Sequence, residues 1–178
     1  MLYLRHHLVA LSLMVMSKKN REGVLRRVTW VAVSGGFDPL HVGHVRMFKA
    51  ARKLGDKLVV ILNNDHWLRA KKGYSFMPQH ERRELILAFP FVDRVVITSH
   101  RARDPDTSVV RELSRLRPSI FANGGDRKKE NTPEDAACEQ LGIRQRYGVG
   151  RGGKIQSSSW MIQNACTVLT KKNGVDIA

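Results

Sequence analysis

The stretch VTWVAVSGGFDPLHVGH, residues 28–44, joins a run rich in β-branched residues to a glycine-rich turn and the start of a helix. A short apolar run that ends at glycine and proline is typical of a buried strand. The helix predicted over residues 42–54 places Val45, Phe48 and Ala51 on one face. A strand, a turn and a helix in this order predict the first unit of an α/β fold.

The same alternation continues along the chain. Further strands are predicted at residues 58–62, 94–97, 119–122 and 144–147, and further helices at 78–89, 106–116, 132–142 and from the serines at 157 onward. Thr132 and Pro133 supply an N-cap and a first-turn proline, and Gly142 ends that helix. Five strands alternating with helices predict a doubly wound, Rossmann-like, five-stranded parallel sheet with helices on both faces.

The chain carries a strong positive charge. Its 178 residues include 31 Lys and Arg against 16 Asp and Glu, a formal net charge of +15. Such a field attracts nucleotides, nucleic acids or anionic membranes. Aromatic residues do not alternate with the basic ones as a single-strand-binding surface requires, so an anionic small substrate is a stronger prediction than nucleic acid.

The termini and the cysteines bear on the class of protein. Cys138 and Cys166 form no metal-binding pattern, and we interpret them as free thiols of a cytoplasmic protein. The apolar run at residues 8–16 is too short to span a membrane and has no evident cleavage site, so it fits an over-long start as well as a targeting segment. We therefore expect residues 1–25 to lie outside the fold and residues 26–178 to form one domain.

Three loops follow strands at the edge of the sheet where ligands bind. In doubly wound sheets this edge is formed by the carboxyl ends of the strands, around the point where the winding reverses. The loops are SGGFDPLHVGH (34–44), NGGDRKKEN (123–131) and GVGRGGKIQSSS (148–159). All three are rich in glycine and in groups that can contact a phosphate. Topology and composition therefore predict the same site.

The first loop ends in two histidines. His41 and His44 are three residues apart at the entrance of a helix, so both imidazoles can lie on one face beside exposed backbone N–H groups. This arrangement suits condensed phosphate charge. Gly35 and Gly36 allow the backbone to approach a ligand, and Gly43 leaves room for a nucleotide.

Other interpretations of this loop remain open. The histidines could be plain helix caps, or a metal pair with Asp38 as a third ligand, although that site lacks an identifiable fourth ligand. No G-x-G-x-x-G follows the first strand, which argues against a nicotinamide or flavin dinucleotide site of that type.

The third loop approaches the P-loop pattern G-x-x-x-x-G-K-[ST]. Gly148, Gly153 and Lys154 have the right spacing, but Ile155 stands where a Ser or Thr would bind Mg²⁺. Three serines follow in front of an apolar helical run.

GGFDPLHVGH resembles the HxGH signature of the nucleotidyltransferase superfamily, which includes glycerol-3-phosphate cytidylyltransferase and the heptose-phosphate adenylyltransferases. The resemblance runs from about Val31 to Ile162. It passes through ARKLGDKLVVILNND, the Lys71-Lys72 pair, HERRELIL, NGGD and the serine segment. Several motifs in the family's order make this a specific match.

The resemblance implies roles for individual residues. His41 and His44 would hold a nucleoside triphosphate and stabilise charge as its α-phosphorus is attacked, and Lys72, with Lys71, would lie over the triphosphate and the acceptor. The implied nucleotide-binding residues are Gly35, Gly36, Phe37, Asp38, Gly43, Arg83 of the E-x-R segment, and Gly125 and Asp126 of NGGD. The plainer alternatives are a solvated basic loop for the lysines, a helix-surface arginine and an Asx turn.

The resemblance also answers the question of the P-loop. Ser157, Ser158 and Ser159 would hold the β- and γ-phosphates, so the P-loop spacing is a coincidence of a glycine-rich turn. A plain N-cap is the alternative for these serines. Arg151 stands one residue farther from the first serine than in the cytidylyltransferases, which leaves its role open. Mg²⁺ is implied as a cofactor by the triphosphate, and not by a carboxylate cluster.

The predicted reaction transfers a nucleoside monophosphate from an NTP to a phosphorylated small molecule and releases pyrophosphate. CTP is favoured because the protein is small and stands alone, and ATP is the alternative. The acceptor is a polyol phosphate, a sugar phosphate or a phosphoalcohol. We expect a homodimer without a membrane span or a nucleic-acid partner. A different class of protein, a basic nucleotide- or nucleic-acid-binding protein without turnover, remains as a second alternative.

Overall fold

The computed structural model describes residues 17–19, 23, 25–124, 132–150 and 157–173. Its main sheet contains β3 (Trp30–Gly35), β4 (Lys57–Leu62), β5 (Arg94–Ile97), β6 (Ile120–Gly124) and β7 (Arg144–Val149). The strand order is β5-β4-β3-β6-β7 and every neighbouring pair is parallel. This confirms the predicted doubly wound sheet, and it places the reversal of winding between β3 and β6.

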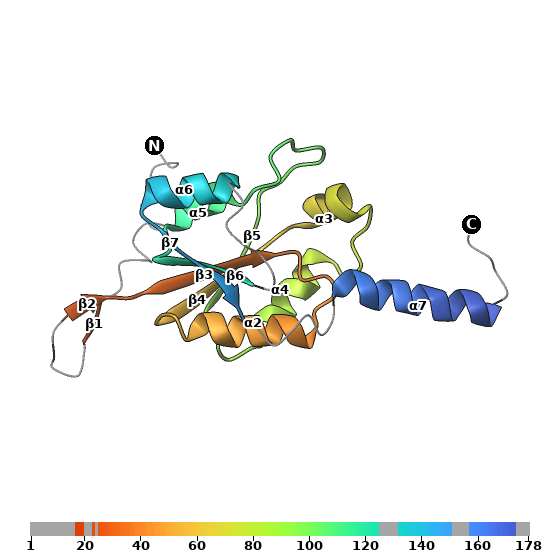
Figure 1. The fold of residues 1–178 in the computed structure, drawn as a ribbon, viewed down its shortest axis with the longest axis horizontal. Coiled ribbons are helices and arrows are strands. Elements are labelled where there is room, and N and C mark those ends of the chain that lie inside the picture. Colours follow the sequence, from red (N-terminus) through yellow and green to blue (C-terminus); the bar gives the residue numbers. More distant parts are fainter. Residues whose placement is uncertain (1–16, 20–22, 24, 125–131, 151–156, 174–178) are drawn as a thin grey trace.

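Helices cover both faces of the sheet. They are α2 (Val42–Arg52), α3 (Asp65–Lys72), α4 (Gln79–Leu87), α5 (Val110–Leu116), α6 (Pro133–Leu141) and α7 (Ser158–Asn173). In Figure 1, α5 and α6 lie on one face, α2 and α4 on the other, and α7 extends away from the sheet. Among the described residues, no helix is both long and apolar enough to span a bilayer.

Alternating residues of the strands pack into two separate hydrophobic cores, one on each face of the sheet. On β3, Val31 and Val33 pack with Phe48 of α2 and Ile86 of α4, while neighbouring residues of the strand face α5 and α6. All four of these side chains have no exposed surface. Because both faces of the sheet are buried, its strands are almost continuously apolar, which is why the sequence predicts them well.

Two helices differ most from the prediction. α5 begins at Val110 instead of residue 106, because the Asp106 carboxylate accepts a hydrogen bond from the Ser108 backbone N–H at 2.9 Å and holds a turn there. α3 was not predicted at all. It has eight residues, and among them only Leu68 is buried, so it lacks an apolar stripe. Lys71 and Lys72 therefore lie at the end of a helix and not in a loop.

A small hairpin precedes the sheet. β1 (Ser17–Lys19) pairs antiparallel with β2 (Leu25–Arg27), and these two strands form a sheet of their own. Arg26 of β2 forms an ion pair with Asp56 at 2.5 Å, which ties the hairpin to the turn before β4. Cys138 is a buried free thiol, as predicted, and Cys166 is exposed.

The domain boundary can be tested by truncation. We expect removal of residues 1–25 to leave the free energy of unfolding unchanged within error, because β1 pairs with β2 and not with the main sheet. Urea unfolding followed by circular dichroism measures this, with the full chain as the control. A large loss of stability would place the N-terminal segment inside the fold.

Candidate functional site

The two histidines of the first loop form one stacked unit at the start of α2. Their ring centroids are 3.7 Å apart with an interplanar angle of 26°. His41 is the N-cap: its Nδ1 accepts a hydrogen bond from the Gly43 backbone N–H at 3.1 Å. The Nδ1 of His44 accepts from the His41 backbone N–H at 3.3 Å, which completes a capping box.

These hydrogen bonds fix the tautomer of both rings. A neutral imidazole carries one proton, and Nδ1 is an acceptor in each ring, so the proton lies on Nε2. Burial, and then the charge of Lys72, lowers the pKa of His41 below its usual value. Burial, followed by the effects of His41 and Lys72, lowers the pKa of His44 to about 3. Both histidines are therefore neutral Nε2–H donors at physiological pH.

Buried residues support this pair. Phe37 is 5% exposed and directs ring edges toward both His44 and Phe48, each at a centroid distance of 5.0 Å. The predicted contact of Phe37 with the nucleotide stays a prediction. In the structure Phe37 packs against the His44 ring, so it would influence a bound nucleotide by positioning His44. A Cβ at Gly43 would lie 2.8 Å from the His41 ring, so glycine is required here because the capping histidine folds over the first turn.

The glycines before the loop serve the protein's own packing. A Cβ at Gly35 would lie 2.8 Å from the Phe37 ring, and one at Gly36 would lie 2.7 Å from Leu68. Both distances are too short for a side chain. In the structure it is the side chains of Phe37 and Leu68 that approach the backbone at Gly35 and Gly36. The predicted approach of a ligand to this backbone remains a prediction.

Asp38 joins the histidine loop to the turn between α3 and α4. Its side chain has no exposed surface, and its two carboxylate oxygens accept hydrogen bonds from the Phe76 N–H at 2.7 Å and the Met77 N–H at 2.8 Å. Its carbonyl oxygen accepts a bond from Lys72 Nζ at 3.1 Å. Lys72 thus lies near the histidines, burial lowers the pKa of its ammonium group, and its expected place over the triphosphate stays a prediction.

A buried arginine that the sequence analysis did not single out fixes this turn. Arg82 has no exposed surface and donates to the carbonyl oxygens of Gly36 (2.6 Å), Asn63 (2.8 Å) and Met77 (2.9 Å), and to the Asp65 carboxylate (2.5 Å). Burial would raise the pKa of Asp65, but hydrogen bonds from Arg82, Gln79 and Ser75 outweigh it and lower that pKa.

Arg83, the predicted nucleotide-binding arginine, is exposed on α4. Its predicted role is not tested by this placement. Helix phase distinguishes the two arginines, because Arg82 lies four residues before the buried Ile86 and therefore shares its face.

The serine segment lies at the N-terminus of α7. Ser158 is 9% exposed and donates its hydroxyl to the Pro39 carbonyl at 2.9 Å, which joins α7 to the histidine loop. Ser157 Oγ accepts from the Trp160 N–H at 3.2 Å, and Ser159 is exposed. Gly125, Asp126 and Arg151 lie outside the described residues. The structure thus brings the start of α7 to the start of α2.

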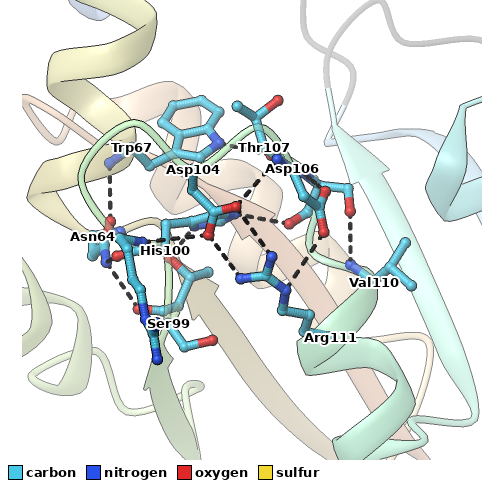
Figure 2. A network of polar contacts seen from close by, with 12 residues as sticks. Asn64, Trp67, Ser99, His100, Asp104, Asp106, Thr107, Val110 and Arg111 are labelled. Carbon is cyan, nitrogen blue, oxygen red and sulfur yellow. Dashed lines mark hydrogen bonds and ion pairs between the residues drawn. The ribbon is translucent and has the colours of Figure 1, made fainter.

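A polar network holds the loop after β5 against the start of α3 (Figure 2). The Asn64 amide donates to the carbonyl oxygens of Thr98 (3.1 Å) and His100 (2.6 Å), and Trp67 Nε1 donates to the Thr107 carbonyl at 2.8 Å. The ring of the buried His100 contacts Thr98 Oγ1 at 2.8 Å and the Ser108 carbonyl at 3.0 Å. These hydrogen bonds hold the loop after β5 firmly beside α3.

A metal centre built from protein side chains does not fit the described part of the chain. No three His, Cys, Asp or Glu side chains gather there to hold an ion. Asp38, the third ligand in the metal alternative, already uses both carboxylate oxygens on backbone N–H groups.

Replacing Arg82 tests the turn. Arg82→Met removes a charged donor from the Asp65 carboxylate and from three carbonyl groups, and breaking such a buried pair costs about 3–5 kcal/mol of unfolding free energy. Urea denaturation measures the loss. Arg83→Met is the matched control and should change stability by less than about 0.5 kcal/mol, as an exposed substitution does. Equal effects of both variants would contradict the assignment.

The charge state of the histidines can be measured directly. With a pKa of about 3, His44 should show no titration of its ring proton signals by NMR between pH 5 and 8. An unfolded histidine titrates near pH 6.5. Because the unfolded chain binds this proton at a higher pH, the free energy of unfolding should fall as pH is lowered from about 6.5 toward 3. A His44 titration near 6.5 in the folded protein would refute the neutral-donor assignment.

Similarity to known proteins agrees with this geometry. Residues 32–146 match the family Cytidylyltransferase-like. The bifunctional protein HldE of Streptomyces coelicolor is 39% identical over 116 residues, 64% of this chain and 24% of the relative. The FAD synthase of Pyrococcus horikoshii is 36% identical over 112 residues, 62% of this chain and 68% of the relative.

A plant enzyme extends the range of relatives. The ethanolamine-phosphate cytidylyltransferase of Arabidopsis thaliana is 32% identical over 130 residues, which is 71% of this chain and 31% of the relative. The chain thus spans about a quarter of the length of the HldE relative and about two thirds of the FAD synthase. The matched residues begin within β3 and end within β7. On the fold, the stacked histidines and this match, the chain belongs to the cytidylyltransferase-like nucleotidyltransferase family.

Proposed function

We propose that this protein is a nucleotidyltransferase that moves a nucleoside monophosphate from an NTP to a phosphorylated small molecule and releases pyrophosphate. The observation that carries the proposal is the stacked pair His41–His44, whose Nε2–H groups are neutral donors at the N-terminus of α2 beside Lys72. A helix N-terminus with such donors is suited to bind phosphates.

The chemistry requires no general base from the protein. The second pKa of a phosphate monoester is about 6, so the acceptor is mostly a dianion at pH 7. One of its oxygens forms a bond to the α-phosphorus, and the bond from that phosphorus to the oxygen bridging to the β-phosphate breaks. The electron pair and the negative charge leave with pyrophosphate. The protein contributes positioning and stabilisation of this charge.

The stacked pair and Lys72 supply the stabilisation. The two Nε2–H donors are held by the backbone before any ligand arrives, so they need no reorganisation during the reaction. The Lys72 ammonium adds a positive charge on the same side, since its Nζ contacts the Asp38 carbonyl. Neutral histidines also make the site independent of protonation near pH 7.

The first turn of α7 is proposed to bind the β- and γ-phosphates. Its backbone N–H groups, with the hydroxyls of Ser157, Ser158 and Ser159, lie at a second helix N-terminus that the Ser158–Pro39 bond joins to the first. Two helix N-termini at one place favour a polyanion. Mg²⁺ belongs to the substrate as the Mg–NTP complex, because triphosphate oxygens are its preferred ligands.

CTP is the favoured nucleotide and ATP the alternative, and the relatives include both a cytidylyltransferase and an FAD synthase. The acceptor is proposed to be a small phosphate monoester, and the candidates expected from the sequence are a sugar phosphate, a polyol phosphate and a phosphoalcohol. The enzyme is further proposed to act in the cytoplasm as a homodimer, and the free thiol of Cys138 supports a reducing compartment.

Pyrophosphate release tests the proposal. The purified protein is assayed with CTP, ATP, GTP or UTP, Mg²⁺ and a panel of phosphorylated sugars, polyols and alcohols. We expect release with one nucleotide, and His44→Ala should lower kcat by about 10²–10³, as loss of one aligned donor does. Leu85→Ala, at an exposed apolar residue of α4 outside the predicted site, is the control. Nucleotide binding without release across the panel would favour the non-catalytic alternative.

A further inference from the structure

Two aromatic side chains lie exposed in the turn between α3 and α4. Phe76 is 60% exposed and Tyr74 is 37% exposed. Single exposed apolar residues are common on protein surfaces, and they carry no argument alone. These two are distinguished by how firmly their turn is held and by what lies beside it.

Four hydrogen bonds hold this turn. The single hydroxyl proton of Ser75 is donated to one of two acceptors within reach, the Asp65 carboxylate at 3.0 Å or the Met77 carbonyl at 3.1 Å. The Phe76 and Met77 N–H groups donate to the buried Asp38 carboxylate, and Arg82 donates to the Met77 carbonyl. The turn therefore presents its rings from a rigid backbone, which lowers the entropy that a ligand must overcome on binding.

The turn lies next to the reacting groups. Asp38 binds the Phe76 N–H through its carboxylate and Lys72 through its carbonyl, so the aromatic turn and the lysine share one residue of the histidine loop. Lys72 is also the last residue of α3, directly before the turn. Arg69 and Lys71 are exposed in the same final turn of α3 and add positive charge beside the rings.

Topology places this turn on the acceptor's half of the site. The proposed triphosphate ligands come from the start of α2, which follows the central strand β3, and from the start of α7, which follows the edge strand β7 beyond β6. The α3–α4 turn belongs to the connection from β4 to β5, on the other side of β3. A nucleotide that binds at the reversal of winding leaves the β4–β5 half to the second substrate.

We propose that Phe76 and Tyr74 form an aromatic wall for the acceptor, and that the acceptor is a phosphate monoester carrying a planar ring system. This inference rests on the proposed function and deepens it. Cations of α3 would bind the phosphate while a planar ring stacks on Phe76. A compact acceptor such as a polyol phosphate or phosphoethanolamine offers no planar face for these rings to cover.

Ligand binding provides the first test. Flavin mononucleotide is the planar probe and glycerol 3-phosphate the compact one, and flavin fluorescence reports stacking. We expect the wild-type protein to bind the flavin more tightly, and Phe76→Ala to weaken that binding about 10- to 100-fold, the effect of losing one aromatic stacking partner. Phe76→Trp should restore it. Leu85→Ala, at an exposed apolar residue of α4, is the control and should have no effect.

Turnover provides the second test. Phe76→Ala should raise the KM for the planar acceptor by the same factor while kcat and the KM for the nucleotide change less than about threefold. Binding of nucleotide measured separately confirms that the variant is folded.

The outcomes separate the two proposals. Pyrophosphate release with compact acceptors, unaffected by Phe76→Ala and with no flavin binding, overturns the aromatic wall and leaves the transferase in place. Flavin binding that depends on Phe76, with no release from any acceptor, supports the wall and overturns the transferase. Neither binding nor release overturns both.

Discussion

The buried Asp38 residue is the constraint on which the rest of the site depends. A carboxylate removed from water is costly unless hydrogen bonds satisfy it, and here two backbone N–H groups of the α3–α4 turn do so. Its carbonyl holds Lys72. Asp38 alone therefore fixes both the Lys72 ammonium group and the α3–α4 turn. Arg82 joins the same turn to the histidine loop, because it donates to the carbonyl oxygens of Met77 and Gly36.

The electrostatic character of the site follows from the same packing. Burial and the nearby lysine keep the two histidines neutral, so the cationic contribution comes from Lys72 and from the dipoles of two helix N-termini. In a chain of net charge +15, neutral donors avoid adding further repulsion at a point where positive charge already gathers. The positive field of the whole protein thus favours polyanion binding, and the neutral Nε2–H groups of His41 and His44 orient the bound polyanion.

Much of the fold could be predicted from the sequence because its strands are buried on both faces. Val31, Val33, Leu58 and Val60 are all fully buried, and their continuous apolar pattern identifies the strands directly. The Thr132 N-cap and the end of the helix at Gly142 were also predicted, since local side-chain chemistry determines both. α3 was missed because its ends are fixed by Asn64 and Gly73 while its surface is mostly polar.

The candidate site was predictable in part. His41, His44 and Lys72 do come together, because they follow adjacent parallel strands. At Gly43 the His41 ring occupies the space that a side chain would need, and the expected room for a nucleotide stays a prediction. Arg82 was missed because a motif of the form E-x-R directs attention to Arg83, although the spacing of Arg82 from Ile86 contained the signal. The long-range contacts of Asp38 could not be read from sequence at all.

The attachment of α7 has a thermodynamic consequence. This helix has 16 residues, and every side chain from Gln163 to Leu169 is exposed. Most helical stability in proteins comes from tertiary packing and not from propensity, and this part of α7 is exposed. Its hydroxyl link to Pro39 lies in the first turn. An anion bound at that turn, as proposed above, would stabilise the helix that follows, so ligand affinity and helix formation would be two measures of one equilibrium.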